Sequence, residues 1–494
     1  MLISVFDKSS IVTFAQRLKD FGAEIVSSGG TARVLNEAGV ACLDVADLTG
    51  YPPILSHRVV TLHPMVHGGL LGNPSDPEHA QDFETYGIKP FDMVVGNLYP
   101  FSAQPSIEMI DIGGPSMLRS AAKNHHRVTV VVDPADYDAV LTEISIHGDT
   151  LLTTRIALAR KAFAHTAAYD AAIVGWFDGD AAAPVTKHIT LERHAELRYG
   201  ENPHQAGALY TFAGTSSWWS SARQLGGKEL SYLNVFDTDA AWRLVHSLGD
   251  APAAVVIKHA NPCGAAIGGD VADAYRKAHL CDPVSAFGGI VAVNRDMTAA
   301  AATALCEVFT EVIIAPSFDD DALEILTAKK NLRIIAAGVP ESARSHMRTV
   351  GNAMLIQDHD VVCFERSKCT VPSTAQPSED DWAEAEFAWR VCARVSSNAI
   401  VLTANRQAFG VGAGQQNRVE SAAIAVRKAD GRAGGGAAAS DAFFPFRDGF
   451  DEVVKAGVRV VVEPGGSVRD QDVIDAANEH GIALIFTGKR HFRH

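Results

Sequence analysis

The fold is decided by residues 2–44, which read LISVFDKSSIVTFAQRLKDFGAEIVSSGGTARVLNEAGVACLD. Apolar runs that suit strands lie at 2–7 and 23–30. Segments 9–22 and 31–39 instead space their apolar residues as a helix does, and each ends on a glycine. An alternation of strands and helices is typical of a parallel sheet with helices on its faces. We therefore expect an α/β fold at the start of the chain.

The chain has 494 residues, which is more than one hydrophobic core of roughly 250–300 residues normally holds. Two further buried strands are expected at 91–101 and 127–133, and a long helix at 153–177. The segment after that helix, DGDAAAPVTKHIT, is small, polar and contains proline, which is typical of a domain boundary. We expect one domain at 1–186 and a second at 187–494.

The second part of the chain also mixes strands and helices. Its strand-like runs are AAVVIKH, GGIVAVN, EVIIAP, NAIVLT, GVRVVVEPG and GIALIFTG, and helical segments follow several of them. Residues 340–380 show no readable pattern. The glycine- and alanine-rich stretch at 428–440 is expected to be a mobile loop.

Composition and charge narrow the class of protein. Hydrophobic residues make up 47% and charged residues 20% of the chain, as in ordinary globular proteins. Apolar runs are shorter than the roughly 20 residues of a membrane span, and the first residues do not resemble a signal peptide, so we expect a cytoplasmic protein. The net charge of −15 argues against a nucleic-acid partner but leaves small anionic ligands open.

Two motifs in the first domain suggest anion binding. The stretch SSGGTAR at 27–33 places glycines where a strand meets a helix, and backbone amides there can hold a phosphate. An ordinary glycine turn is the alternative. The stretch DIGGPSMLRSAAKNHHR at 111–127 places an acid before a helix that carries Arg119 and Lys123. It suits anion binding and proton donation, or it is simply a basic surface helix.

The second domain contains VVIKHANPCGAA at 255–266, in which a buried strand ends in Lys258 and His259. A turn is expected after the Asn-Pro pair that follows. In an open α/β sheet, ligands bind at the carboxyl ends of strands, so the histidine suits a general base and the lysine suits stabilisation of negative charge. A salt-bridged lysine and a hydrogen-bonded histidine are the alternative.

Metal sites are not expected in either domain. His63 and His67 are separated by Pro64 and lack the glutamate of a zinc-protease motif. Zinc deaminases need His-x-Glu and Pro-Cys-x-x-Cys, whereas His259 is followed by Ala-Asn and Cys263 by Gly-Ala-Ala. The seven cysteines form no Cys-x-x-Cys pair, so neither a zinc knuckle nor a disulfide framework is indicated.

Taken together and in order, the motifs strongly resemble the bifunctional purine biosynthesis protein family. They are SVFDKSS, SSGGTAR, TLHPMVHGG, NLYPF, DIGGPSMLRSAAKNH, LRYGENPHQ, KHANPCG, DPVSAFGG, SNAI, GVGAGQQNR and SDAFFPFRD. The resemblance implies a methylglyoxal-synthase-like parallel α/β domain with IMP cyclohydrolase activity. It also implies a duplicated cytidine-deaminase-like α/β domain without zinc, which transfers a formyl group to AICAR (aminoimidazole carboxamide ribotide). The implied co-substrate is 10-formyltetrahydrofolate, and the implied assembly is a homodimer with transformylase sites at the subunit interface.

The resemblance also implies roles for individual residues. Catalytic roles in formyl transfer fall on Lys258, His259 and Asn398, and catalytic roles in ring closure on Tyr99, Asp111 and Lys123. Substrate-binding roles fall on Lys8, Ser28, Gly29, Gly30, Thr31, Arg58, Thr61, Asn97, Arg198, Tyr199, Phe443, Asp448 and Arg490.

Two departures from the family pattern affect these expectations. Val60 stands where the family commonly has a lysine, and Ser396 replaces a lysine often found before Ser-Asn-Ala-Ile. Valine neither donates a hydrogen bond nor carries charge. The main hypothesis is a two-activity enzyme. The alternatives are a transformylase whose first domain has become a nucleotide-binding and structural module, and a zinc nucleoside deaminase.

Overall fold

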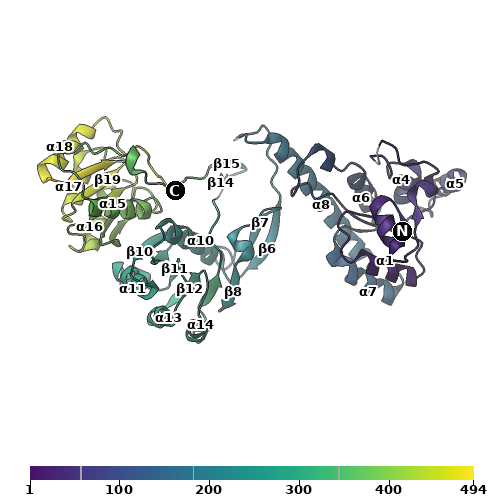
Figure 1. Ribbon diagram of the computed structural model, residues 1–494, viewed down its shortest axis with the longest axis horizontal. Helices are drawn as coiled ribbons and strands as arrows, with labels where there is room; N and C mark the ends of the chain where they lie inside the picture. Colours follow the sequence, from purple (N-terminus) through teal and green to yellow (C-terminus); the bar gives the residue numbers. More distant parts are fainter. Residues whose placement is uncertain (56–57, 182, 343–344) are drawn as a thin grey trace. The chain divides into compact units, whose positions relative to one another are not determined.

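The computed structural model describes residues 1–494 except 56–57, 182 and 343–344 (Figure 1). The chain forms two compact units. The first comprises Met1–Thr190 with Phe212–Gly214, and the second comprises Leu191–Thr211 with Thr215–His494.

The first unit is built on a five-stranded sheet in which every neighbouring pair is parallel. The strands, in their spatial order, are β3 (Leu43–Asp44), β2 (Val26–Ser27), β1 (Leu2–Val5), β4 (Met93–Asn97) and β5 (Thr129–Val131). The central strands are almost fully buried, because helices cover both faces of a parallel sheet. The expected parallel α/β fold is confirmed.

Two separate apolar clusters pack on the two faces of this sheet. The helices are α1 (Ile11–Asp20), α2 (Gly29–Glu37), α3 (Val45–Thr49), α4 (Pro64–Leu71), α5 (Pro77–Tyr86), α6 (Gly113–Lys123), α7 (Tyr137–His147) and α8 (Leu152–Asp178). On one face α1 packs against α7, where the Phe14 and Tyr137 rings stack at 4.1 Å. On the other face α6 packs against both α4 and α8.

The strand order reverses direction between β1 and β4. From β1 the chain moves outward to β2 and β3, and it then returns to β4 on the other side of β1. Connections that diverge in this way leave a crevice at the carboxyl ends of the two strands, which is where open α/β sheets bind ligands.

The second unit contains an eleven-stranded mixed sheet. Its strands, in spatial order, are β20 (Ala483–Phe486), β19 (Val460–Glu463), β18 (Ala437–Ser440), β16 (Ile400–Ala404), β17 (Gln407–Gly412), β10 (Asn261–Ile267), β9 (Ala253–Lys258), β11 (Gly289–Val293), β12 (Thr310–Ala315), β13 (Arg333–Ala336) and β8 (Arg223–Gly226). The sheet divides into two halves between β10 and β17, which pair antiparallel at Ala266 and Gln407.

The two halves of this sheet repeat one topology. Each begins with an antiparallel hairpin, β9–β10 or β16–β17, whose first strand also pairs antiparallel with β11 or β18. Two further parallel strands follow in each half. The expected duplication is therefore present in the fold.

The helices repeat as well. The pairs are α10 (Tyr232–Ser247) with α15 (Glu379–Cys392), α11 (Val271–Cys281) with α16 (Arg418–Ala429), α13 (Ala299–Cys306) with α17 (Arg447–Val454), and α14 (Asp320–Thr327) with α18 (Asp470–His480). One continuous apolar cluster, which includes Trp242 and Trp389, lies beneath α10 and α15 across both halves. On the other face each half has its own cluster.

Two segments differ from the sequence-based expectation. Residues 345–358 form the exposed hairpin β14 (Ser345–Val350) and β15 (Ala353–Asp358). The stretch expected to be a mobile loop ends in the buried strand β18, and a Cβ at Gly436 would lie 1.9 Å from the Thr403 carbonyl oxygen. The glycines there permit close packing of main chains. Of the helices that the structure describes, none combines the length and apolar character that a membrane span needs.

Candidate active sites

The first unit has a cavity of about 1240 Å³ at the carboxyl ends of β1 and β4. Its lining includes ten of the residues expected at the ring-closing site. They are Lys8, Ser28, Gly29, Gly30, Thr31, Arg58, Thr61, Asn97, Tyr99 and Asp111. Segments far apart in the sequence therefore meet where the strand order reverses.

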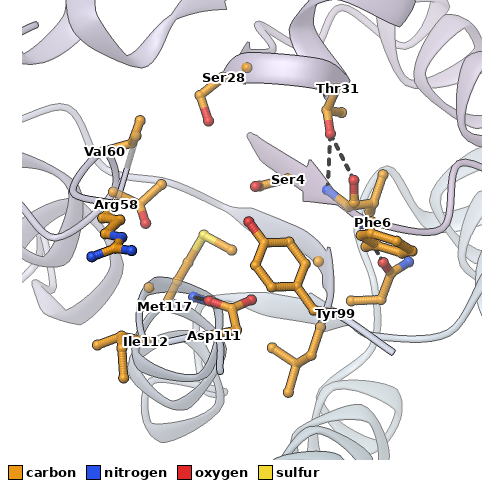
Figure 2. Close-up of a pocket in the computed structure, with 18 of the residues that line it drawn as sticks. Ser4, Phe6, Ser28, Thr31, Arg58, Val60, Tyr99, Asp111, Ile112 and Met117 are labelled. Atoms are coloured by element: carbon orange, nitrogen blue, oxygen red, sulfur yellow. Dashed lines mark hydrogen bonds between the residues drawn. The ribbon is translucent and has the colours of Figure 1, made fainter. Parts of the chain in front are cut away.

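Thr31 and Asn97 shape the floor of this pocket through the main chain after β1. The Thr31 hydroxyl donates to the Val5 carbonyl at 3.0 Å and accepts from the Val5 N–H at 3.2 Å. The side-chain oxygen Oδ1 of Asn97 accepts hydrogen bonds from the N–H groups of Phe6 and Asp7 at 2.6 and 2.8 Å. Figure 2 shows the two bonds of Thr31. Because their polar groups serve the main chain, both residues hold the loop that carries Lys8.

The glycine motif begins α2 at the edge of the pocket. Ser28 is the N-cap residue, and its side chain makes no capping bond. Gly29 has φ of +54°, a conformation that favours glycine. The Lys8 ammonium lies 3.9 Å from the position of a Cβ on Gly30 and donates to the carbonyls of Val5 and Phe6. A helix N-terminus with a nearby ammonium suits a phosphate group.

Tyr99 and Asp111 line the cavity, and burial shifts the pKa of each (Figure 2). Burial raises the pKa of the Asp111 carboxyl, although hydrogen bonds from the Gly114 and Gly113 N–H groups oppose the shift. Burial and the nearby Asp111 charge raise the pKa of Tyr99. The Tyr99 ring stands edge-on to Phe6, with centroids 5.6 Å apart. A neutral phenol beside a half-buried carboxyl suits proton transfer.

Arg58 and Val60 line another wall of the cavity. The Arg58 guanidinium contacts the Glu108 carboxylate at 2.6 Å, and both side chains are largely exposed. Val60 packs against the apolar cluster on this face. The Thr61 hydroxyl lies 3.0 Å from the position of a Cβ on Gly113, so glycine at the start of α6 allows this close approach.

Lys123 is not among the residues that line the cavity. It is the last residue of α6 and is exposed, whereas the first two residues of that helix, Gly113 and Gly114, line the pocket. Within one chain, Lys123 therefore does not lie in the cavity that Tyr99 and Asp111 line.

In the second unit, Lys258 ends β9, and His259 and Ala260 form a two-residue turn into β10. Both turn residues have positive φ, 51° and 58°, as a tight hairpin requires. The turn was expected after the Asn-Pro pair, and this expectation is wrong because Asn261 and Pro262 already belong to β10. The Lys258 ammonium donates to the carbonyls of Phe287 and Gly288, each at 3.0 Å.

Asp237 on α10 stabilises the turn at His259 and Ala260, called the histidine turn below. Its carboxylate accepts the Ala260 N–H at 2.8 Å. Burial raises the pKa of Asp237, while the Ala260 hydrogen bond and the charges of His259 and Lys258 act in the opposite direction. His259 itself is exposed, so its imidazole is accessible to a substrate.

Asn398 lies on a segment that is tied to the same turn. The Ser396 N–H donates to the Asn261 side chain at 2.8 Å, and Arg493 donates to the carbonyls of Ala260 and Arg394, each at 2.6 Å. The amide of Asn398 donates to the Gln415 carbonyl and accepts from Arg418, both at 2.9 Å.

The remaining expected residues lie on three further segments. Arg198 lies over the Tyr199 ring at 4.8 Å, and main-chain bonds to Leu230 and Tyr232 tie this pair to the start of α10. Phe443 is half-buried shortly after β18, Asp448 is exposed in the first turn of α17, and Arg490 lies over Phe492 at 4.5 Å after β20.

Sequence reasoning missed four polar residues at this second site. They are Asp237, Asn261, Arg418 and Arg493. Two of them, Asn261 and Arg418, stand inside the motifs KHANPCG and GVGAGQQNR, which provided a usable signal. The other two reach the site from α10 and from the end of the chain, and no local pattern marks them.

The part of the chain that the structure describes contains no group of three or more His, Cys, Asp or Glu side chains suited to a metal ion. Cys263 occupies the place of the deaminase Pro-Cys motif. Burial raises the pKa of its thiol to about 12, and the sulfur contacts the Val256 carbonyl.

Comparison with known proteins yields two family matches. The family described as AICARFT/IMPCHase bienzyme matches residues 121–428, and the MGS-like domain matches residues 10–125. Among solved structures, a chain titled "Crystal structure of ForH" is 38% identical over 36% of this chain and 98% of that chain, with a TM-score of 0.33.

Proposed function

The chain belongs to the AICARFT/IMPCHase bienzyme family, and from this premise we propose which of its residues carry out the two reactions of that family. The enzyme catalyses the last two steps of de novo purine synthesis. It transfers a formyl group from 10-formyltetrahydrofolate to AICAR, and it closes the ring of formyl-AICAR to give IMP and water. We assign ring closure to residues 1–186 and formyl transfer to residues 187–494.

For formyl transfer, His259 acts as the general base. The amine nitrogen of AICAR attacks the formyl carbon, its proton passes to the imidazole, and the folate nitrogen departs with a proton to give tetrahydrofolate. Lys258 stabilises the negative charge that develops on the formyl oxygen, and Asn398 donates to the same oxygen. The connection of the histidine turn to the Asn398 segment through Asn261 and Arg493 supports this assignment.

For ring closure, Tyr99 and Asp111 are the catalytic pair. The carboxamide nitrogen attacks the formyl carbon and gives up one proton, the formamide nitrogen gives up a second proton as the C=N bond forms, and the formyl oxygen takes up both protons and leaves as water. The observation that carries the proposal is the raised pKa of Asp111 beside Tyr99 in the large pocket. A carboxyl that titrates closer to neutral pH exchanges protons more effectively. We assign Lys123 a supporting role on the basis of the family pattern alone.

The other assignments concern binding. Ser28, Gly29 and Gly30 at the start of α2 hold the phosphate of formyl-AICAR, with Lys8 and Arg58 as cations and Thr61 as a hydroxyl donor. At the second site the ribotide and the folate contact Arg198, Tyr199, Phe443, Asp448 and Arg490. We further propose that the protein is a cytoplasmic homodimer that requires no zinc.

Product analysis tests the proposed function most directly. The purified protein is mixed with AICAR and 10-formyltetrahydrofolate, and the products are identified by mass. Formation of IMP faster than spontaneous closure is the expected result. Accumulation of formyl-AICAR favours the second candidate function, a transformylase whose first unit only binds nucleotides, and Val60 in the pocket wall is the observation that motivates that candidate. Absence of both products would refute the proposal.

A further inference from the structure

We propose that Tyr169, on the long helix α8, is a positioning residue for ring closure, because its hydroxyl holds Asp111 in place through the main chain. This inference rests on the proposed function, since it assumes that Asp111 takes part in the closure. Tyr169 lies 58 residues beyond Asp111 in the sequence, and it is not among the residues that line the cavity.

The Tyr169 hydroxyl joins two peptide groups in the segment that runs along the pocket wall. It donates to the Met109 carbonyl at 2.5 Å and accepts the Asp111 N–H at 2.7 Å. These groups flank Ile110, where the 3₁₀-helix Ile107–Met109 has ended and α6 has not yet begun. No regular element pairs the main chain there, so one side-chain hydroxyl supplies both partners.

The carboxyl group of Asp111 is held from the opposite direction. Its Oδ1 accepts the Gly114 N–H at 2.7 Å. A Cβ on Gly114 would lie 2.3 Å from Oδ2, which shows how closely the start of α6 packs against the carboxyl. The N–H of Asp111 is thus fixed by α8 and its carboxyl by α6, and these two helices pack against each other.

Tyr169 is itself firmly placed. Its side chain is 8% exposed, and its ring stands edge-on to buried Phe101 at 6.1 Å and 70°. Burial raises the pKa of Tyr169, so the phenol keeps its proton at neutral pH and remains a donor to Met109. A rigid, protonated hydroxyl suits the support of a group that must be held within a fraction of an ångström.

Tyr169→Phe tests the inference because it removes one oxygen and keeps the ring. We expect kcat for cyclisation of added formyl-AICAR to fall about 10- to 100-fold, since a displacement of about 1 Å can cost that much, while KM changes little. Tyr137→Phe is the matched control. It removes the hydroxyl of another buried tyrosine, whose ring stacks against Phe14 on the other face of the sheet, and it should keep the kcat of the wild type.

A double-mutant cycle separates positioning from a general loss of stability. Once Asp111→Asn is present, adding Tyr169→Phe should lower kcat little further, because the group that it positions is already gone. The acid limb of the kcat profile against pH should shift in Tyr169→Phe and disappear in both variants with asparagine. All assays are run at a temperature at which thermal denaturation shows every variant folded.

Two results would overturn the inference. One is an unchanged kcat in Tyr169→Phe, and the other is full additivity with Asp111→Asn. Formyl transfer, measured on the same full-length samples, should stay unchanged throughout. A wild-type protein that fails to accelerate cyclisation would instead contradict the proposed function, so the two failures are distinguishable.

Discussion

Val60 is a pocket residue of the first unit at which the sequence departs from the pattern of the family that it resembles. It lines the cavity and packs against the apolar cluster, so it contributes shape rather than charge. Lys8 and Arg58 line the same cavity, and the first turn of α2 adds unpaired amides. Cations and donors are therefore available without a lysine at position 60.

Val60→Lys should change the rate of cyclisation of formyl-AICAR by less than about threefold, equivalent to about 0.7 kcal/mol in the barrier. Val60→Met is the matched control, because it adds length without charge. Steady-state rates at low and high salt provide the measurement. A lysine variant more than about tenfold faster than the methionine variant would mean that the natural pocket lacks an essential cation.

His259 is the residue on which formyl transfer should depend most. His259→Asn keeps a side chain that tolerates positive φ, so the turn should survive. Formyl transfer should fall by about 10²- to 10⁴-fold, the usual contribution of a general base, while cyclisation of added formyl-AICAR stays unchanged. Both rates are measured on one preparation.

The control for this prediction is a substitution in the turn of the β16–β17 hairpin. Asn405 stands at the equivalent turn position, with φ of 52°, and Asn405→His should leave both activities intact. Loss of cyclisation together with transfer in a folded His259→Asn protein would contradict separate sites.

Among the secondary-structure elements, β19 carries an unusual buried acid at its end. Glu463 is fully buried, one carboxyl oxygen accepts the Phe444 N–H at 2.8 Å, and the other has no hydrogen-bond partner among the described residues. Burial raises the pKa of Glu463 to about 8 from its ordinary 4.5. The Glu463 carboxyl therefore stays largely protonated at pH 7. Through its bond to Phe444 it holds the loop after β18, which contains the expected ligand contact Phe443.

Glu463→Gln should flatten the dependence of stability on pH. Between pH 4.5 and 8 the folded wild type keeps a proton that the unfolded chain releases, so its free energy of unfolding falls as the pH rises through this window. Glutamine has no proton to lose. The melting temperature of the variant minus that of the wild type should therefore increase by several degrees as the pH rises from 4.5 to 8. A change of about 1 kcal/mol in the free energy of unfolding moves the melting temperature by about 2–4 °C.

Tryptophan fluorescence follows this transition in the second unit, which holds all the tryptophans except Trp176. Glu479→Gln is the control. Arg447 holds the pKa of that exposed carboxyl below its usual range, so its replacement should give no rise across the same window. Parallel curves for Glu463→Gln and the wild type would show that Glu463 is not buried as a neutral acid.

The sequence predicts some elements well and others poorly, for physical reasons. The strands of the first unit are buried on both faces and alternate with helices, so apolar runs and glycine stops reveal them. The hairpin β14–β15 buries no residue, so its sequence carries no apolar face that could reveal the strands. The turn at His259 and Ala260 lacks the Asn-Gly or Asp-Gly signal of tight hairpins. The glycines before β18 look like a loop because their packing partner, Thr403, is distant in sequence.

The same limit applies to the candidate sites. Ten of the residues that line the pocket were expected at the ring-closing site, and they stand in or beside short motifs. Asp237, Arg493 and Tyr169 act from distant helices or from the end of the chain, through bonds that no local spacing encodes. Hydrogen bonds between residues that are distant in the sequence can be identified only from the folded structure.

At the scale of the whole molecule, the proposed homodimer predicts that the two activities respond differently to dilution. Light scattering at micromolar concentration should give a mass near twice the 52.6 kDa of one chain. If the transformylase sites lie at the subunit interface, formyl transfer per chain should fall as dilution separates the subunits. Ring closure should not fall, because its pocket lies within one unit. Equal loss of both activities, or full transfer by monomers, would contradict this arrangement.

The two matched halves of the eleven-stranded sheet predict which positions of the protein tolerate substitution. Two hairpin turns hold equivalent places, and in each an acid on the neighbouring helix accepts the N–H of the second turn residue: Asp237 for Ala260 and Glu384 for Arg406. Only one turn carries lysine and histidine, so the repeat provides no spare copy of the chemistry. A library of viable variants should therefore accept many residues at 405–406 and almost none at 258–259, although a comparison of backbones alone would rank the two turns as equals.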